Sequence, residues 1–256
     1  MCRVISFVSA SGGVGKSSLI YHVANEISIK YKVCVLDSYF SINDLSIRFL
    51  NDDGVDFKEY LIGKLGTKNV LNKMKNNLYV VKSNDRFDYL KHSELIKFFI
   101  SEISMDFDYV LIDVNSFDLR ILTLMIEASN EIIFICTDNE MCIRNTSKML
   151  SYIKNFDSIK SIKYVLNKAR IIHSIKNKCF NLNDISEVLK IEAISVIPKF
   201  YYNNHKFINK RMRKSSIYIK KLSYAIITNK LSFVDEYKKY KGVLGLIKRI
   251  RCFKYE

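Results

Sequence analysis

Proline is almost absent from this chain, with one proline among 256 residues, while 48% of the residues are hydrophobic. This composition excludes a linker-rich protein and indicates a compact, fully folded one. A chain of this length suits one large α/β domain or two small ones. It is also long enough to bury a continuous core.

Long hydrophobic runs are absent as well. No apolar run reaches the roughly 18 residues that a membrane-spanning helix needs. The longest candidate, residues 121–137, is interrupted by Glu127, Asn130 and Glu131. Near the start, Arg3 is followed only by an apolar run of strand length, so the sequence offers no secretory signal. We therefore expect a cytoplasmic protein.

The six cysteines, at positions 2, 34, 136, 142, 179 and 252, form no Cys-x-x-Cys pair, and no histidine lies near them at metal-ligand spacing. Several fall inside predicted strands, where cysteine behaves as a small apolar residue. The pattern argues against a disulfide framework, and we expect reduced thiols.

Acidic residues are scarce in the C-terminal part of the chain. Residues 1–150 contain 17 Lys and Arg against 19 Asp and Glu, a net charge of −2, whereas residues 151–256 contain 24 against 7, a net charge of +17. A lysine-rich codon usage would raise lysine along the whole chain and would not confine the excess to one end. The asymmetry therefore indicates an anionic partner for the C-terminal part.

The most informative stretch that is present is Ser-Ala-Ser-Gly-Gly-Val-Gly-Lys-Ser-Ser, residues 9–18, between an apolar β-branched run and a helical pattern. Strand, glycine loop and helix in this order form a cradle whose N–H groups surround a phosphate. Lys16 would contact the β- and γ-phosphates, and Ser17 would bind Mg²⁺. The alternative is a glycine-rich turn with a solvent-facing lysine. The residues expected to bind nucleotide here are Ser11, Gly12, Gly13, Val14, Gly15, Lys16, Ser17 and Ser18.

This loop resembles the deviant phosphate loop of the MinD/ParA family, Lys-Gly-Gly-x-Gly-Lys-[Ser/Thr], with Ala10 in place of the first glycine of the general P-loop pattern. The resemblance implies a single α/β domain of the SIMIBI type of P-loop NTPase, with a doubly wound, mostly parallel sheet. It also implies ATP and Mg²⁺ as cofactors and a homodimer. In that family the leading lysine crosses the dimer interface to the partner's nucleotide, and here Ser11 stands at its position.

Two further motifs place carboxylates at strand ends. Residues 37–46 resemble the family's Asp-x-Asp motif, in which the first Asp belongs to the Mg²⁺ environment and the second orients the attacking water. Asp37 matches the first position, and Tyr39 occupies the second, where a phenol with a pKa near 10 activates water poorly. The alternative for Asp37 is a cap at the strand end. Asp113 closes the apolar run 107–113, as in a Walker B strand, and would hold a Mg²⁺-bound water.

Later segments continue the pattern of alternating strands and helices. The strand at 131–137 and the helix at 138–150 are similar to those of MinD proteins and of the CpaE and TadZ pilus-localisation proteins, and Arg144 is a candidate cation on residue type. Asn167 follows a strand at 164–166, where the family has an asparagine near the adenine, although a strand-end turn also favours asparagine. A strand at 193–198 resembles the family's last core strand.

Three local patterns concern helices. Residues 41–76 have a weak helical pattern. Residues 93–103 predict a helix whose apolar stripe, Leu95, Phe98, Phe99 and Ile103, packs in the core. Asp184 and Glu187 have the spacing of a capping box.

The basic C-terminal part contains two helical patterns. Residues 204–230 predict a solvated surface helix with an apolar face of Ile217, Leu222, Ala225 and Ile226. Residues 236–256 predict a separate basic amphipathic helix after a nucleotide-binding domain at 1–235. MinD proteins end in a similar helix that binds an anionic membrane surface; the alternative is a helix docked on the protein's own core. Its membrane-facing and basic residues are Val243, Leu246, Ile247, Ile250, Phe253, Lys248, Arg249 and Arg251.

These patterns predict a Mg·ATP-binding, MinD/ParA-like protein that acts as a positional or assembly factor on the inner membrane surface. We also expect a protein partner, which the sequence does not identify. Because Ser11 and Tyr39 depart from the family, we expect slow or absent hydrolysis. Three alternatives remain open: an ATPase stimulated by a partner, a ParA-like protein that binds DNA without sequence preference, and a nucleotide-free scaffold.

Overall fold

The computed structural model describes residues 2–38, 44–50, 54–83, 87–175, 179–199, 208–230 and 232. Eight strands in these ranges form one sheet, in the order β3-β4-β2-β5-β1-β6-β7-β8. β3 pairs antiparallel with β4, and the other neighbours are parallel. The strands are β1 (Arg3–Val8), β2 (Val33–Asp37), β3 (Asn72–Lys75), β4 (Leu78–Val81), β5 (Tyr109–Asp113), β6 (Glu131–Cys136), β7 (Ser161–Ala169) and β8 (Glu192–Pro198).

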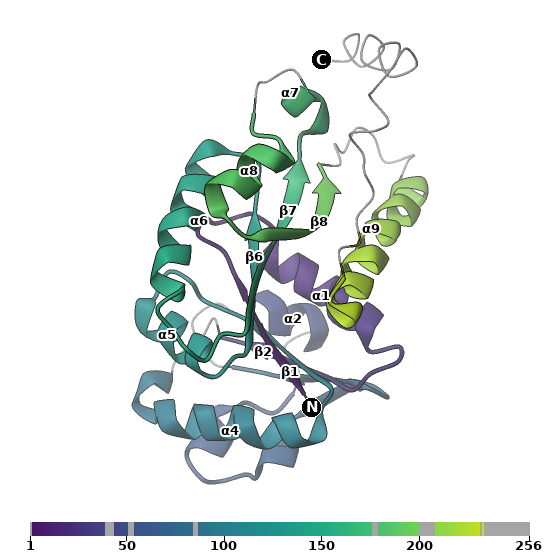
Figure 1. Ribbon diagram of the computed structural model, residues 1–256. Helices are drawn as coiled ribbons and strands as arrows, with labels where there is room; N and C mark the ends of the chain where they lie inside the picture. The colour runs from purple at the N-terminus through teal and green to yellow at the C-terminus, as the bar shows by residue number, and fades with distance from the viewer. Residues whose placement is uncertain are drawn as a thin grey trace.

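Helices cover both faces of this sheet (Figure 1). α1, α2 and α9 lie on one face, and α4, α5, α6 and α8 lie on the other, which confirms the predicted doubly wound α/β fold. The helices are α1 (Lys16–Ile27), α2 (Asp44–Leu50), α3 (Lys58–Leu61), η1 (Thr67–Asn69), η2 (Tyr89–His92), α4 (Ser93–Asp106), α5 (Leu119–Glu127), α6 (Glu140–Ile153), α7 (Ile171–Ile175), α8 (Leu182–Leu189) and α9 (Ile208–Thr228).

The central strands are continuous apolar runs because both of their faces are buried. Every residue of β2 and β5 is buried, and so is all of β1 after Arg3. Each of these strands ends beside its parallel neighbour, so their carboxyl ends lie at one edge of the sheet. Residues 9, 38 and 114 leave the sheet at this edge, which is where a doubly wound fold places its ligand.

The expectation for residues 41–76 is wrong at its C-terminal end. Residues 72–75 form the strand β3, which pairs with β4 through a two-residue turn at Asn76 and Asn77. Two asparagines between short strands favour such a turn because the asparagine side chain can hydrogen-bond to nearby backbone groups. The remaining described part of the segment contains α2, α3 and η1 in place of one helical region.

Two other local predictions need correction. The buried face of α4 consists of Ile96, Phe99, Ile100 and Ile103, whereas Leu95 and Phe98 of the predicted stripe are 43% and 62% exposed. The capping box lies three residues earlier than predicted: Asn181 caps α8, and Asp184 accepts from the Asn181 N–H. Phe99 and Ile103 are buried as predicted, and the capping-box spacing is right with a different first residue.

α9 packs against α1 and β8, so it is more than a solvated surface helix. Leu222, Ala225 and Ile226 are buried as predicted, while Ile217 is half exposed. The end of α9 is held at the start of β1 by Arg3, whose guanidinium pairs with Glu131 and donates to the carbonyl oxygens of Ile226 and Ile227. α9 therefore runs from the ligand edge of the sheet, where Ser216 and Ile219 lie, to the opposite edge.

The pairing of β7 with β8 is irregular. Leu166 pairs with Val196 and Ala169 pairs with Pro198, so between these two pairs β7 advances three residues while β8 advances two. Within this interval Lys168 has a left-handed backbone, with φ +54°. The irregularity lies beside the glycine loop.

Several predicted residues lie outside the described ranges: Tyr39 and the whole segment 236–256, including Val243, Leu246, Ile247, Lys248, Arg249, Ile250, Arg251 and Phe253. Within the ranges that are described, no helix combines the length and hydrophobicity needed to cross a bilayer.

Candidate functional site

The glycine loop connects the end of β1 to the start of α1, and its backbone explains its glycines. Gly13 and Gly15 have φ values of +69° and +92°, a region that residues with a side chain rarely adopt. A Cβ at Gly15 would also lie 2.7 Å from Nδ2 of Asn167, whereas a Cβ at Gly12 would meet nothing within 4 Å. The loop therefore requires glycine at position 15 for two independent reasons, and Gly12 borders open space.

A cavity of about 370 Å³ lies over this loop. All eight loop residues predicted to bind nucleotide, from Ser11 to Ser18, line it, together with Asp37 and Asp113. A second cavity of about 610 Å³ adjoins it, because Gly15, Ser18 and Lys168 line both. Asn167 lines the second cavity, whose apolar wall comes from Leu19, Ile197, Pro198 and Ile219. The site is thus an elongated groove with a polar end and a more apolar end.

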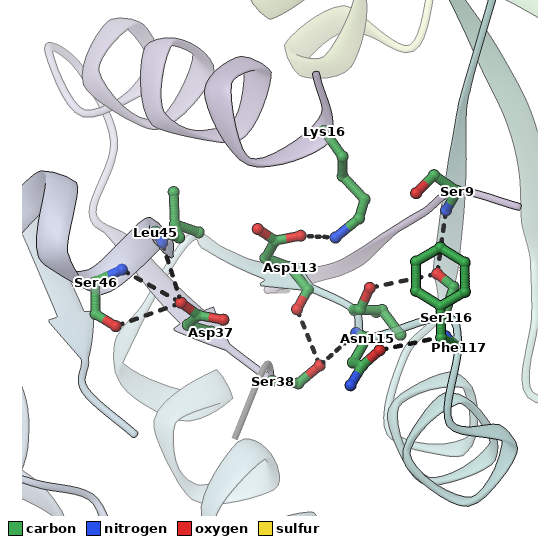
Figure 2. Close-up of polar contacts among 11 residues, drawn as sticks. Ser9, Lys16, Asp37, Ser38, Leu45, Ser46, Asp113, Asn115, Ser116 and Phe117 are labelled. Atoms are coloured by element: carbon green, nitrogen blue, oxygen red, sulfur yellow. Dashed lines mark hydrogen bonds and ion pairs between the residues drawn. The ribbon is translucent and has the colours of Figure 1, made fainter. Parts of the chain in front are cut away.

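Lys16 and Asp113 form an ion pair at the bottom of the first cavity (Figure 2). Both side chains are almost inaccessible to water, at 4% and 1% exposure. Burial lowers the pKa of the Lys16 ammonium, and the nearby Asp37 carboxylate opposes this shift. The pairing offsets part of the desolvation free energy that each buried charge would cost alone.

Asp37 stands opposite Asp113 in the register of β2 and β5, so the two carboxylates end neighbouring strands side by side. Its Oδ2 accepts hydrogen bonds of 3.3 Å from the N–H groups of Leu45 and Ser46 and from the Ser46 hydroxyl. Asp37 therefore accepts hydrogen bonds from the first turn of α2, and it also lines the cavity.

The oxygen groups in the cavity suit Mg²⁺, which prefers carboxylate, hydroxyl and water oxygens. Ser17, Asp37 and Asp113 all line the cavity. Oδ2 of Asp113 is buried and receives no hydrogen bond from any residue that the structure describes. A buried carboxylate oxygen without a donor leaves room for a cation or its bound water, so the residues present fit this metal.

Sequence reasoning missed a set of small polar residues that joins the three strand ends (Figure 2). The Ser38 hydroxyl donates to the Asp113 carbonyl oxygen at 2.9 Å and accepts from the Asn115 N–H at 3.0 Å. The Ser9 N–H donates to the Ser116 hydroxyl at 3.1 Å. These bonds couple the glycine loop, the segment after β2 and the segment after β5. Ser9 opens the glycine-loop stretch, but no motif marks Ser38 or Ser116.

Asn167 and Lys168 both contact the glycine loop. Nδ2 of Asn167 donates to the Val14 carbonyl oxygen at 2.7 Å, and Nζ of Lys168 donates to the Gly13 carbonyl oxygen at 2.5 Å. Asn167 is therefore more than a strand-end turn residue, and one end of its amide is already engaged by the loop. Arg144 lies exposed on α6 and is not among the residues that line either cavity.

Comparisons with known proteins agree with this geometry. No model of a known protein family matches the sequence. The chain is similar to the septum site-determining protein MinD of Thermotoga maritima, 23% identical over 209 residues, with 77% of this chain and 76% of that protein covered. It is 22% identical over 205 residues to MinD of Bacillus subtilis, with 77% and 76% covered. The solved structure of MinD with Mg-ADP from Pyrococcus horikoshii shares its fold, with a TM-score of 0.73, 18% identity and coverage of 88% of this chain and 96% of that one.

Proposed function

Because this chain is a relative of the MinD/ParA family of P-loop ATPases in sequence and in fold, we propose that it binds Mg·ATP in the groove formed by the two cavities. One observation carries the proposal. Lys16, Asp37 and Asp113 converge over a loop in which Gly13 and Gly15 have the positive φ values of a phosphate cradle.

Each residue then has a defined role. The loop N–H groups and Lys16 hold the phosphates in the polar cavity, and Ser17, Asp37 and Asp113 hold the metal or its waters. The more apolar cavity, with Asn167 in its wall, takes the base. To reach a phosphate, the Lys16 ammonium would leave Asp113, and the Asp113 carboxylate would then be able to hold the metal or its water. Bound Mg²⁺ supplies charge neutralisation for the phosphates.

Slow or absent hydrolysis is the second part of the proposal. Ser11 stands at the position of the family's lysine, which stabilises charge at the partner's nucleotide, and Tyr39 takes the place of the water-orienting carboxylate. Loss of an equivalent charged group reduces phosphoryl transfer by about 10³-fold or more. The groove therefore holds a triphosphate more readily than it cleaves it.

The third part is a role as a positional or assembly factor at the cytoplasmic face of a membrane. Its support is the +17 charge of residues 151–256 and the amphipathic pattern of residues 236–256. Two copies paired around ATP would double a weak anchor, because a single amphipathic segment binds a membrane only reversibly.

Calorimetry with Mg·ATP tests the first part. We expect wild type and Lys190→Ala, an exposed control that follows α8 and lines neither cavity, to bind, and Lys16→Ala to lose binding. An absence of heat from well-folded wild type would contradict nucleotide binding.

Co-sedimentation with vesicles containing anionic lipid tests the third part. The full chain should pellet more strongly with ATP than without it, and the chain truncated before Lys241 should not pellet. DNA retention that falls steeply with salt and survives the same truncation would favour the alternative of a DNA-binding partition protein.

A further inference from the structure

Side chains at the end of β7 donate hydrogen bonds to backbone carbonyl oxygens of the glycine loop. Asn167 and Lys168, two successive residues, donate to Val14 and Gly13, two successive carbonyl oxygens, at 2.7 and 2.5 Å. The two hydrogen bonds join residues that are 153 and 155 positions apart in the chain. These bonds therefore depend on the fold and not on the loop sequence alone.

The orientation of these carbonyls fixes the orientation of two N–H groups. In a trans peptide the C=O and the following N–H point in opposite directions. The Gly13 carbonyl and the Val14 N–H belong to one peptide group, and the Val14 carbonyl and the Gly15 N–H belong to the next. Because both carbonyls point toward their donors on β7, the N–H groups of Val14 and Gly15 point away from those donors, and both residues line the first cavity.

We propose that Asn167 and Lys168 are positioning residues that orient the loop N–H groups for phosphate before the nucleotide arrives. The inference rests on the proposed function of the groove. Donors held in place in advance need no reorganisation when an anion binds, so the hydrogen bonds to β7 increase affinity. Asn167 is 7% exposed and packs against Gly15, and Lys168 supplies the charged donor at the junction of the two cavities.

Hydrogen exchange of the nucleotide-free protein tests this role directly. Lys168→Met removes the donor and keeps the bulk of the side chain, and Lys168→Arg restores a cationic donor. Lys190→Met is the matched control, because Lys190 also has a left-handed backbone, with φ +52°, at the end of α8. We expect amides in residues 9–18 to exchange about tenfold faster in Lys168→Met, which is the effect expected from losing one hydrogen bond from a charged donor. Exchange of the same amides should be unchanged in Lys168→Arg and Lys190→Met.

Binding measured on the same variants supplies the second readout. Lys168→Met should weaken Mg·ATP binding about tenfold, and Lys168→Arg should recover most of it. Asn167→Asp replaces the donor with an acceptor of the same shape and should also accelerate exchange in the loop.

Two results would overturn the proposal: unchanged exchange in Lys168→Met with weakened Mg·ATP binding, which would mean that Lys168 contacts phosphate directly, or no change in either measurement. Exchange is measured without nucleotide, so it decides the role of β7 even if wild type binds no Mg·ATP. Failure of the proposed function is thus distinguishable from failure of this inference.

Discussion

Lys16 and Asp113 form an ion pair whose two side chains are almost inaccessible to water, and both residues line the cavity over the glycine loop. In this arrangement the cation of the loop and the anion of β5 neutralise each other. In the proposed binding mode this pair separates when Lys16 contacts a phosphate, so the pair links the stability of the fold to ligand binding in the groove.

A double-mutant cycle on this pair measures the link. Lys16→Met leaves the Asp113 carboxylate buried without its partner and should destabilise the protein by about 3 kcal/mol. Asp113→Asn should cost less, because Asp37 remains close to the Lys16 ammonium. The double variant should recover much of the loss, and urea unfolding at neutral pH gives all three values. Additive losses would mean that the two residues do not interact in solution.

Alanine at two glycines of the loop separates backbone strain from open space. Gly15→Ala forces an unfavourable φ of +92° and drives a methyl group into the Asn167 amide, so we expect a loss of about 2 kcal/mol. Gly12→Ala is the control, since its methyl group meets nothing, and its stability should change by less than about 0.5 kcal/mol. Equal losses in denaturant unfolding would show that the loop in solution differs from this backbone.

Restoring the two family residues tests the proposal of slow hydrolysis. The double variant Ser11→Lys with Tyr39→Asp supplies a cation for the developing charge and a carboxylate for the attacking water. Phosphate release should rise by about 10³-fold over wild type. Adding Lys16→Ala to the double variant should abolish that gain and so exclude a contaminating ATPase. Rapid release by wild type alone would contradict the proposal.

The reactivity of Cys179 gives a pH-dependent prediction away from the groove. Burial and the Asp138 carboxylate, which accepts from the thiol at 3.4 Å, raise the pKa of Cys179 to about 11. The thiolate is the reactive form, so at pH 8 only on the order of one thiol in a thousand is ionised. Alkylation of native protein, followed at Cys179 by mass spectrometry, should accelerate tenfold per pH unit up to about pH 11. Unfolded protein, with an ordinary thiol, should show a plateau near pH 9.

The sequence was sufficient for those parts of the fold that depend on local order. The strand before Ser9, the glycines, Lys16 and the carboxylates at the ends of β2 and β5 are all specified by short stretches of chain, and the register of a parallel sheet then brings Asp37 beside Asp113. The apolar strands could be found because burial on both faces leaves a run without alternation.

The parts that were missed depend on partners distant in the chain. Ser38 is 77 residues from Asn115, Ser9 is 107 from Ser116, and Asn167 is 153 from Val14. A serine or asparagine after a strand has no sequence signal that says which backbone group it will meet. The hairpin at Asn76 and Asn77 was missed for a different reason, since β3 is short and half exposed, and its lysines carry no apolar alternation.

The irregular pairing between β7 and β8 has a consequence for the length of the chain at this point. One residue more in β7 than in β8 between two ladder pairs lets Asn167 and Lys168 leave the ladder while Leu166 and Ala169 remain in it. Consider a homologous chain that keeps the glycines and the lysine of the loop but lacks that one residue of β7. We expect its β7 and β8 to pair regularly, and its glycine loop to lose the hydrogen bonds from β7. In the proposed function, an insertion or deletion at residues 166–169 should therefore change nucleotide affinity as a substitution in the glycine loop would.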